Sequence, residues 1–219
     1  MGQEIDLLKN YPRTKRNVDE RGATKTDDVR RVARQFGKDF FDGDRKYGYG
    51  GFKYLSRFWQ PVIPSFQKHF GLTSRSSVLD VGCAKGFMLH DLLELIPDIT
   101  VSGVDISDYA IENAMDDIKS KIQVADAKNL PFPDNSFDVV ISINTIHNLD
   151  RYDCAQALRE IERVSRTGSF ITVDAYRNEE EKERMFAWNL TAKTIMSVDE
   201  WKAFFEEVGY TGDYFWFVP

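Results

Sequence analysis

The sequence predicts a doubly wound α/β fold, in which a mostly parallel sheet is covered by helices on both faces. From Ser77 onward, short β-branched apolar runs typical of buried parallel strands alternate with stretches of helical periodicity. Such alternation is typical of strand–helix–strand units with right-handed crossovers. A length of 219 residues allows one domain of this kind. Ligands of such sheets bind beyond the carboxyl ends of the strands.

The elements after residue 76 are expected to alternate, except that a turn alone joins the third and fourth strands. The predicted strands are SVLDVGC (77–83), TVSGVDI (100–106), KIQVADA (121–127), FDVVISIN (137–144), GSFITVDAYR (168–177) and GDYFWFVP (212–219). The predicted helices are FMLHDLLELI (87–96), DYAIENAMDDI (108–118), DCAQALREIERVS (153–165) and VDEWKAFFEEVG (198–209). Ser197 is expected to cap the start of the last helix, and Gly209 to end it.

The first third of the chain precedes this alternation and is expected to lie over the sheet. Its apolar side chains from Val29 to Phe40 follow helical spacing, and DGDRKYGYGGFKY (42–54) combines glycines with aromatic rings, as a lid would. YLSRFWQPVIPSFQKHF (54–70) is expected to form two short helices or one kinked helix, because two prolines interrupt it. The expected division is a mobile or loosely docked polar arm (1–27), a helical lid (28–75) and a sheet domain (76–219) with a substrate-side insertion (176–197).

Composition and charge exclude several classes of protein. No apolar run approaches the roughly 18 residues that span a bilayer, so a membrane protein is not expected. The first residues lack the apolar stretch of a signal peptide, and two cysteines are too few for a disulfide framework or a zinc site. We therefore expect a soluble cytoplasmic protein without a bound metal. The net charge is −6, yet residues 1–57 carry 14 Lys and Arg against 9 Asp and Glu. Because these charges alternate in sign, we interpret the region as a solvated helix surface rather than a nucleic-acid arm.

A glycine loop, DVGCAKG (80–86), follows the first predicted strand. Glycine there lets the backbone approach a ligand, and the next helix presents free N–H groups. A dinucleotide-binding G-x-G-x-x-G loop that began at Gly82 would need glycine where Ala84 and Phe87 stand. The loop therefore argues against a nicotinamide-dependent oxidoreductase.

Polar residues stand at the carboxyl ends of the next three strands. Asp105 can accept both ribose hydroxyl hydrogens, and Asp126 can accept from an adenine amine. The fourth strand runs into NTIHN (144–148), which places polar side chains at the mouth of the sheet. The combination predicts a nucleoside site at this edge.

Together, these segments resemble the class I S-adenosylmethionine-dependent methyltransferases, in particular their small-molecule group (methyltransferase-domain 11-like). VLDVGCAKG (78–86) is similar to the family's first motif, GVDIS (103–107) to the second, and VADAKNLPFPDNSFDVVIS (124–142) to the third and fourth. The resemblance, close over about residues 76–175, implies a Rossmann-like fold, S-adenosylmethionine as cofactor and S-adenosylhomocysteine as product. Ala84 departs from the family's middle glycine. The single last strand departs from its antiparallel hairpin.

The resemblance also implies a role for each cofactor residue. Gly82 and the backbone of 83–86 would pass the methionine part, while Asp80 would orient the loop and the ammonium group. Asp105 would hold the ribose, and the residues at 106, 126, 127 and 144 would surround the adenine and the methionine end. The full set is Asp80, Gly82, Cys83, Ala84, Gly86, Asp105, Ile106, Asp126, Ala127 and Asn144.

Catalysis and acceptor binding are assigned from the lid and the later strand ends. His147 is either a base for a hydroxyl acceptor or a wall of the pocket, and Tyr47 offers an aromatic face that stabilises a sulfonium. The substrate candidates are Tyr49, Lys53, Asn148, Tyr176, Arg177 and Trp188, of which Trp188 also suits core packing. We expect methylation of an O or N atom of a small polar metabolite. A sugar, a phosphorylated compound or an amino-acid derivative would fit, anionic ones included.

Two alternative functions remain beside this reading, and the oligomeric state is open. A non-catalytic S-adenosylmethionine-binding sensor or partner subunit would share the same cofactor residues. A nucleic-acid methyltransferase is disfavoured, because position 144 begins NTIH instead of the N/D-P-P-Y/F segment of the amino-directed enzymes. An oligomer is compatible with the aromatic last strand (212–219), although a covered core strand explains it as well.

Overall fold

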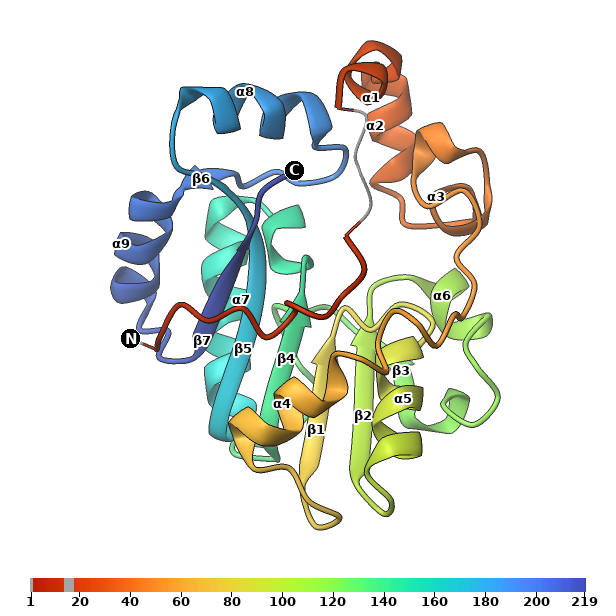
Figure 1. Cartoon of the computed structure of the whole chain (residues 1–219), viewed down its shortest axis with the longest axis vertical. Helices are drawn as coiled ribbons and strands as arrows, with labels where there is room; N and C mark the ends of the chain where they lie inside the picture. The colour runs from red at the N-terminus through yellow and green to blue at the C-terminus, as the bar shows by residue number, and fades with distance from the viewer. Residues whose placement is uncertain (1, 14–17) are drawn as a thin grey trace.

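The computed structural model describes residues 2–13 and 18–219, and its centre is a seven-stranded sheet (Figure 1). The strand order is β3-β2-β1-β4-β5-β6, with β7 also paired to β5, and every pairing between these strands is parallel. The strands are β1 (Ser77–Val81), β2 (Thr100–Asp105), β3 (Ile122–Val124), β4 (Phe137–Ile143), β5 (Ser165–Tyr176), β6 (Met196–Ser197) and β7 (Asp213–Phe217). The predicted doubly wound sheet is confirmed.

Helices cover both faces of this sheet, as predicted. The helices of the described residues, which include those at the ends of the sheet, are α1 (Val18–Thr24), α2 (Asp27–Ala33), α3 (Lys38–Asp42), α4 (Ile63–Phe70), α5 (Phe87–Leu95), α6 (Asp108–Glu112), α7 (Arg151–Val164), α8 (Glu179–Trp188) and α9 (Val198–Val208). One apolar core joins α7 and α9 to the sheet, and the other joins α4 and α5 to it. Within the described part of the chain, every helix is too short or too polar to cross a membrane.

Local sequence explains where the last helix begins and ends. The Ser197 hydroxyl accepts from the Glu200 N–H, and the Glu200 carboxylate accepts from the Ser197 N–H, which forms a capping box. Gly209 ends α9 in the left-handed region, with φ of 77°. Both boundaries agree with the sequence prediction.

Two predicted helices are interrupted by contacts with distant parts of the chain. The helix expected over Val29–Phe40 divides into α2 and α3 at Phe36, whose φ is +50° and whose carbonyl accepts from the Ser107 hydroxyl. The helix expected over 108–118 ends at Glu112, because the chain turns back and the Met115 N–H donates to the Lys85 carbonyl. These two predictions were wrong in length.

The proline-interrupted stretch forms one helix rather than two. Turns occupy residues 56–62, and α4 then begins at Ile63 with Pro64 in its first turn. Proline is tolerated there because the first N–H groups of a helix have no partner within it.

The N-terminal segment extends the sheet beyond β7. Glu4 forms a parallel bridge with Tyr214, whose N–H donates to the Gln3 carbonyl at 3.1 Å and whose carbonyl accepts from the Ile5 N–H at 3.0 Å. Leu7 follows in the apolar core. Of the predicted mobile arm, residues 2–13 are thus docked on the sheet, whereas 14–17 lie outside the described residues. The last strand itself lies directly beside β5.

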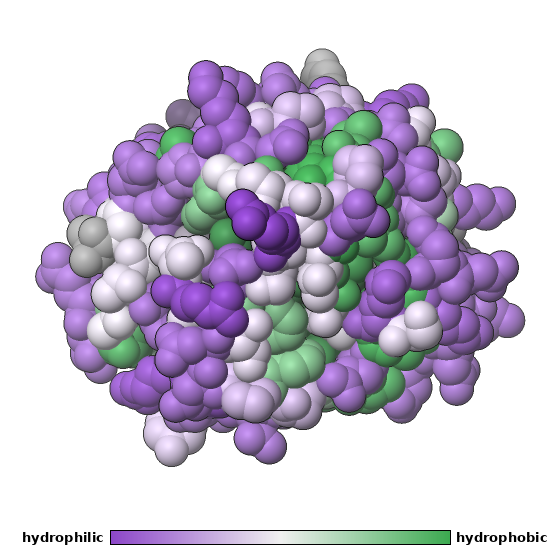
Figure 2. All heavy atoms as spheres, turned by 90° about the horizontal axis from the view of Figure 1, so that it is seen from below, coloured by the Kyte–Doolittle hydropathy of each residue, from purple (hydrophilic) through white to green (hydrophobic). Residues whose placement is uncertain are grey.

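The two ends of the sheet differ in what covers them. We refer to residues 18–53 as the lid from here on, because α4, which the expected lid (28–75) included, packs against the sheet instead. Helices α1–α3 and α8 lie above the carboxyl ends, as Figure 1 shows. The opposite end, seen from below in Figure 2, carries mostly hydrophilic residues with scattered apolar ones between them. A ligand site is therefore expected under the lid.

Candidate functional site

The glycine loop turns the chain sharply from β1 into α5. Gly82 has φ of +88°, and a Cβ at this position would collide with the Thr145 side chain. Gly86 has φ of +76°, and a Cβ there would meet Ile118. Only glycine lets the loop lie this close to its neighbours.

Ala84 occupies the middle of this loop in a left-handed conformation, with φ of +49°. Its N–H donates to Asp105 Oδ2 at 2.8 Å, while Asp105 Oδ1 accepts from the Ser107 N–H at 2.9 Å. Burial raises the pKa of Asp105, and these hydrogen bonds act in the opposite direction. The carboxylate at the end of β2 is therefore fixed in orientation, with Ala84 in place of the expected glycine.

Asp80 lies beside the same loop but lacks the backbone hydrogen bonds that orient Asp105. Its side chain is buried, and it receives no hydrogen bond from the residues that the structure describes. Burial and the nearby Asp105 raise the pKa of Asp80 to about 8. A buried carboxylate without a partner is unfavourable, so this position suits a cationic ligand group.

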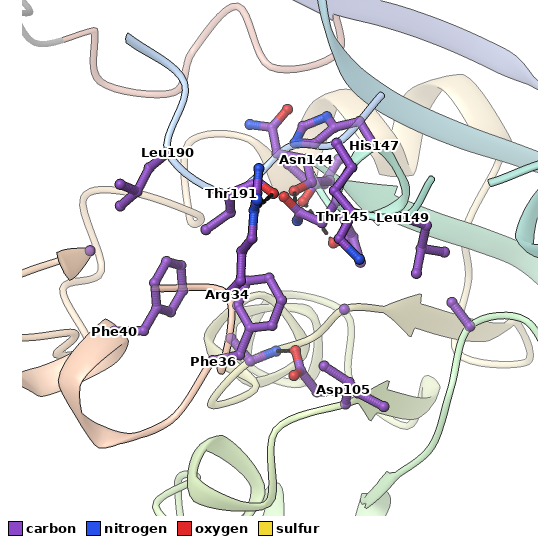
Figure 3. A pocket seen from close by; sticks show the side chains of 18 of the residues that line it. Arg34, Phe36, Phe40, Asp105, Asn144, Thr145, His147, Leu149, Leu190 and Thr191 are labelled. Atoms are coloured by element: carbon purple, nitrogen blue, oxygen red, sulfur yellow. Dashed lines mark hydrogen bonds between the residues drawn. The ribbon is translucent and has the colours of Figure 1, made fainter. Parts of the chain in front are cut away.

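Two cavities meet at the glycine loop. The first has a volume of about 500 Å³ and the second of about 490 Å³. The lining that they share consists of Tyr49, Gly82, Ala84, Ile143, Asn144 and Phe217. Figure 3 looks into the first cavity, with Asp105 on one side and Asn144, Thr145 and His147 on another.

Most of the predicted site residues line these cavities. The first is lined by Asp105, Ile106, Asp126, Ala127, His147, Asn148 and Trp188 in addition to the shared set. The second is lined by Asp80, Cys83 and Arg177. Four predicted residues line neither cavity: Tyr47, Lys53, Gly86 and Tyr176. The structure therefore places nearly all of the predicted cofactor residues at the cavities, but fewer of the predicted catalytic and substrate residues.

The residues outside the cavities have other neighbours. Tyr47 packs against the apolar cluster of Val29 and Leu190, and the Lys46 ammonium lies 4.8 Å from the centre of its ring. Lys53 is exposed. The Tyr176 ring lies 5.6 Å from the Lys182 ammonium.

His147 is buried, and its hydrogen bonding defines its protonation. The Asp174 N–H donates to His147 Nδ1 at 2.9 Å, so the proton of the neutral ring is on Nε2. Burial lowers the pKa of His147, and the nearby Asp174, whose Oδ1 lies 3.8 Å from Nε2, acts against that shift. Because the Nδ1 lone pair already accepts the hydrogen bond from the Asp174 N–H, the ring can donate from Nε2 but has no free nitrogen to accept a proton.

A nearly buried ion pair ties the lid to the glycine loop. Lys85 Nζ lies 2.6 Å from Asp42 Oδ2 and donates to the Phe52 carbonyl at 3.0 Å. The same carboxylate accepts from the Tyr109 hydroxyl at 2.7 Å and from the Phe52 N–H at 2.9 Å. Sequence reasoning missed Asp42 and Lys85. The signal was a lysine inside the glycine loop (80–86), whose other charged residue is Asp80.

Cationic side chains of the lid donate hydrogen bonds to the C-terminal end of α8 and to the segment after it, across the first cavity from Asp105 (Figure 3). Arg21 Nε donates to the Trp188 carbonyl at 3.1 Å, and Lys25 Nζ donates to the Ala187 carbonyl at 2.8 Å. Both carbonyls belong to the last turn of α8, where the helix dipole favours a cation. Arg34 reaches the segment that follows α8. The sequence analysis named neither Arg21 nor Arg34 as a site residue, although the basic N-terminal region was noted.

Comparison with known proteins adds an independent finding. Residues 79–173 match the family model described as Methyltransferase domain. The chain is 30% identical over 153 residues to the 27-O-demethylrifamycin SV methyltransferase of Amycolatopsis mediterranei, a match over 63% of this chain and 55% of that protein. It is 31% identical over 163 residues to the tRNA (carboxymethyluridine(34)-5-O)-methyltransferase of Arabidopsis thaliana, over 68% of this chain and 39% of that protein.

A solved structure shows the same fold. The YcgJ protein from Bacillus subtilis is 22% identical and superposes with a TM-score of 0.55, over 67% of this chain and 66% of that one. The matches with the two methyltransferases cover 55% and 39% of their lengths, so the chain spans about half of such relatives. The parallel sheet, the glycine loop with acidic strand ends, and these matches agree. Over residues 79–173, the chain is therefore similar to the class I S-adenosylmethionine-dependent methyltransferases, whose cofactor is S-adenosylmethionine.

Proposed function

We propose that the protein transfers a methyl group from S-adenosylmethionine to an O or N atom of a small polar metabolite. The observation that carries the proposal is Asp80, a buried carboxylate without a hydrogen-bond partner in the described residues, which lines the second cavity beside the glycine loop. This arrangement suits a ligand that carries an ammonium group. When bound, the cofactor supplies an electrophilic methyl group on a sulfonium.

The residues around the loop fit the rest of the cofactor. The oriented Asp105 carboxylate would accept from the ribose hydroxyls, and Ile106, which is 55% exposed, offers an apolar surface for the adenine ring together with Ala127. Asp126 would accept from the adenine amine. Oδ1 of the Asn144 side chain accepts from the Thr172 hydroxyl at 2.9 Å, which leaves the two N–H groups of the same side chain to the ligand.

The acceptor would enter the first cavity between the lid and the end of β4. Tyr49 belongs to an aromatic cluster with Phe41 and Phe52, and its ring lines both cavities, where it would face the sulfonium. His147 would donate a hydrogen bond from Nε2. Since His147 does not offer a free lone pair, the geometry favours an acceptor atom that needs no deprotonation by this residue, such as a neutral amine or an ionised oxygen.

Calorimetric titration of S-adenosylhomocysteine tests the cofactor half of this proposal. Binding to the wild type is expected to weaken about tenfold or more in Asp105→Ala, which corresponds to about 1.4 kcal/mol. The matched control is Asp116→Ala, which removes an exposed carboxylate and is expected to leave the affinity unchanged. NADH serves as the control ligand. Failure of the folded wild type to bind S-adenosylhomocysteine would refute the proposal.

Turnover separates an enzyme from a non-catalytic binding protein. Wild type is incubated with methyl-labelled S-adenosylmethionine and pools of sugars, phosphorylated metabolites, amino-acid derivatives and unmodified tRNA. Transfer of label to a small acceptor is the expected result. Label in tRNA alone would favour the substrate class named for the Arabidopsis relative, and binding without transfer to any pool would favour a sensor.

A further inference from the structure

Four cationic side chains surround the acceptor side of the first cavity. They come from three separate parts of the lid and from the segment after α8, and Figure 3 shows Arg34 reaching across the cavity toward Thr191. The set consists of Arg21, Arg34, Arg45 and Lys193. We refer to these residues as the cationic cluster.

The arginines of the cluster contact only neutral acceptors. Arg34 donates from Nε to the Thr191 carbonyl at 3.2 Å and from Nη2 to the Ala192 carbonyl at 3.3 Å. Arg21 donates to the Trp188 carbonyl, and Arg45 to the Gly48 carbonyl. Among the described residues, none of the three forms an ion pair with a carboxylate. Each guanidinium has five N–H donors, so several remain for a ligand.

The second cavity lacks this excess of charge. Its arginines are both neutralised, since Arg13 lies 2.7 Å from Asp6 and Arg177 lies 3.3 Å from Glu181. The second cavity also contains Asp80, which places the proposed ammonium site there. The unneutralised cations and the cofactor's proposed amino-acid end therefore lie in different cavities.

The three carboxylates of the first cavity are engaged elsewhere. Asp105 accepts the Ala84 and Ser107 N–H groups, and Asp126 lies 3.5 Å from the Lys128 ammonium. The third carboxylate, at position 174, lies beside His147. Among the side chains that the structure describes, they leave the cationic cluster without a counter-charge.

The cations of the lid also repel one another. Burial and the neighbouring Arg45 lower the pKa of Arg21 to about 10. Burial, Arg30 and Arg21 lower the pKa of Lys25 to about 8, and burial and Arg34 lower that of Arg30. Such mutual repulsion is unfavourable until an anion binds among the charges.

We propose that the cationic cluster binds an anionic group of the methyl acceptor, a carboxylate or a phosphate, and so selects small anionic metabolites. The inference rests on the proposed function, because it takes the side of the first cavity that carries the cluster as the acceptor site and leaves the side with Asp105 and Asp126 to the cofactor. Bidentate donation by arginine matches the geometry of both anions. The Lys193 N–H donates to the His147 carbonyl at 2.9 Å, which joins the cluster to the end of β4. An acceptor anchored by its anion would therefore extend toward His147 Nε2.

Inorganic phosphate and succinate are the probes that test this assignment. Each is titrated into wild type saturated with S-adenosylhomocysteine, at constant ionic strength, and binding is followed by calorimetry and by the rise in melting temperature. Arg34→Gln is expected to weaken probe binding about tenfold. Arg34→Lys keeps the charge but loses the bidentate donation, so its affinity for the probes is expected to lie between those of wild type and Arg34→Gln. Arg31→Gln removes an exposed cation from α2, the helix that ends just before Arg34, and is expected to stay close to wild type. Equal binding by Arg34→Gln and Arg31→Gln would overturn the proposal.

A second titration identifies the source of the anion. S-adenosylhomocysteine carries a carboxylate, whereas 5′-methylthioadenosine lacks the amino-acid part. Both are expected to bind Arg34→Gln as they bind wild type. A loss confined to S-adenosylhomocysteine would assign the cluster to the cofactor's carboxylate and overturn the proposal. The phosphate titration is repeated on the ligand-free protein, so that a failure of cofactor binding and a failure of anion binding are separate results.

Discussion

Arg163 and Arg34 both donate hydrogen bonds to backbone carbonyls, but they differ in what neutralises them. Arg163, on α7, contacts Glu160 at 2.7 Å and Asp134 at 2.9 Å, and donates to the carbonyls of Leu130 and Phe132. These carboxylates raise its pKa. Arg34 has only carbonyls as partners among the described residues.

The contrast separates structural cations from cations available for binding. Arg163 closes a network around the turn between β3 and β4, and its charge is fully paired within the fold. Arg21 and Arg34 of the lid instead donate to neutral carbonyls of residues 188–192. In our proposal, their charge is therefore available to an anionic ligand. The same distinction applies to carboxylates: Asp138 is paired with Arg166 and Ser77, which lower its pKa, whereas burial without a partner raises that of Asp80.

Arg163→Ala is expected to give the largest loss of stability. The Glu160 carboxylate is nearly buried and would retain only the Leu130 N–H as a donor, so the change should cost about 3 kcal/mol. Urea denaturation measures the free energy of unfolding. The matched control, Arg159→Ala, removes an exposed arginine from the same helix. Equal unfolding midpoints for the two variants would contradict the structural role of Arg163.

Asp80→Asn should change the pH dependence of ligand binding. The pKa of Asp80 is near 8 in the ligand-free protein, so the fraction ionised, and with it the affinity for S-adenosylhomocysteine, should rise about tenfold between about pH 6.5 and 8. Asp80→Asn should bind weakly at every pH. Calorimetry across this range measures the slope, and a flat wild-type profile together with unchanged binding by Asp80→Asn would exclude an ammonium contact at Asp80.

Asp80→Asn should weaken ligand binding but raise the stability of the ligand-free protein at high pH. The folded-state pKa of Asp80 lies above that of an unfolded aspartate, so the protonated form is favoured in the fold. The ligand-free wild type therefore loses stability as the pH rises from about 4 to 8. At about pH 9, Asp80→Asn should melt at a higher temperature than wild type, and a lower melting temperature would contradict the sign.

Arg34→Gln is expected to alter stability by less than about 0.5 kcal/mol, because an exposed cation without a carboxylate partner contributes little. The comparison with Arg163→Ala is direct, since both remove one guanidinium. Urea denaturation of the ligand-free protein measures it. A destabilisation as large as that of Arg163→Ala would make Arg34 a structural residue and remove the contrast.

Lys53→Gln should have the smallest effect. Lys53 is exposed and lines neither cavity, so affinities for S-adenosylhomocysteine and phosphate should stay within about twofold of wild type. Calorimetry with both ligands provides the check. A tenfold loss of phosphate binding would restore the acceptor role expected from the sequence.

The sheet was predictable because buried parallel strands are apolar runs that local sequence reveals. Helix lengths failed where distant contacts decided them: the Phe36 carbonyl meets Ser107, and Met115 meets Lys85. The residues of either helix alone do not reveal these distant partners, so the sequence could not predict where the helices end. The parallel placement of β7, with Glu4 beyond it, likewise depends on contacts between the two ends of the described chain.

The candidate cofactor side was predictable because strand ends carry it, and strand ends converge by topology. The lid was harder to predict. Arg21 and Arg34 were interpreted as part of a solvated helix surface, since their carbonyl partners at 188–192 lie more than 150 residues away in sequence. Within the glycine- and tyrosine-rich segment, Tyr49 lines the cavities but Tyr47 does not. Spacing alone does not distinguish these two rings.

The left-handed Ala84 has a consequence for the speed of binding. An alanine held at φ of +49° costs about 1 kcal/mol in the fold, but it visits fewer conformations than glycine would. Its N–H already holds Asp105 before any ligand arrives. Because this part of the loop is already ordered, we expect S-adenosylhomocysteine to associate faster with wild type than with Ala84→Gly.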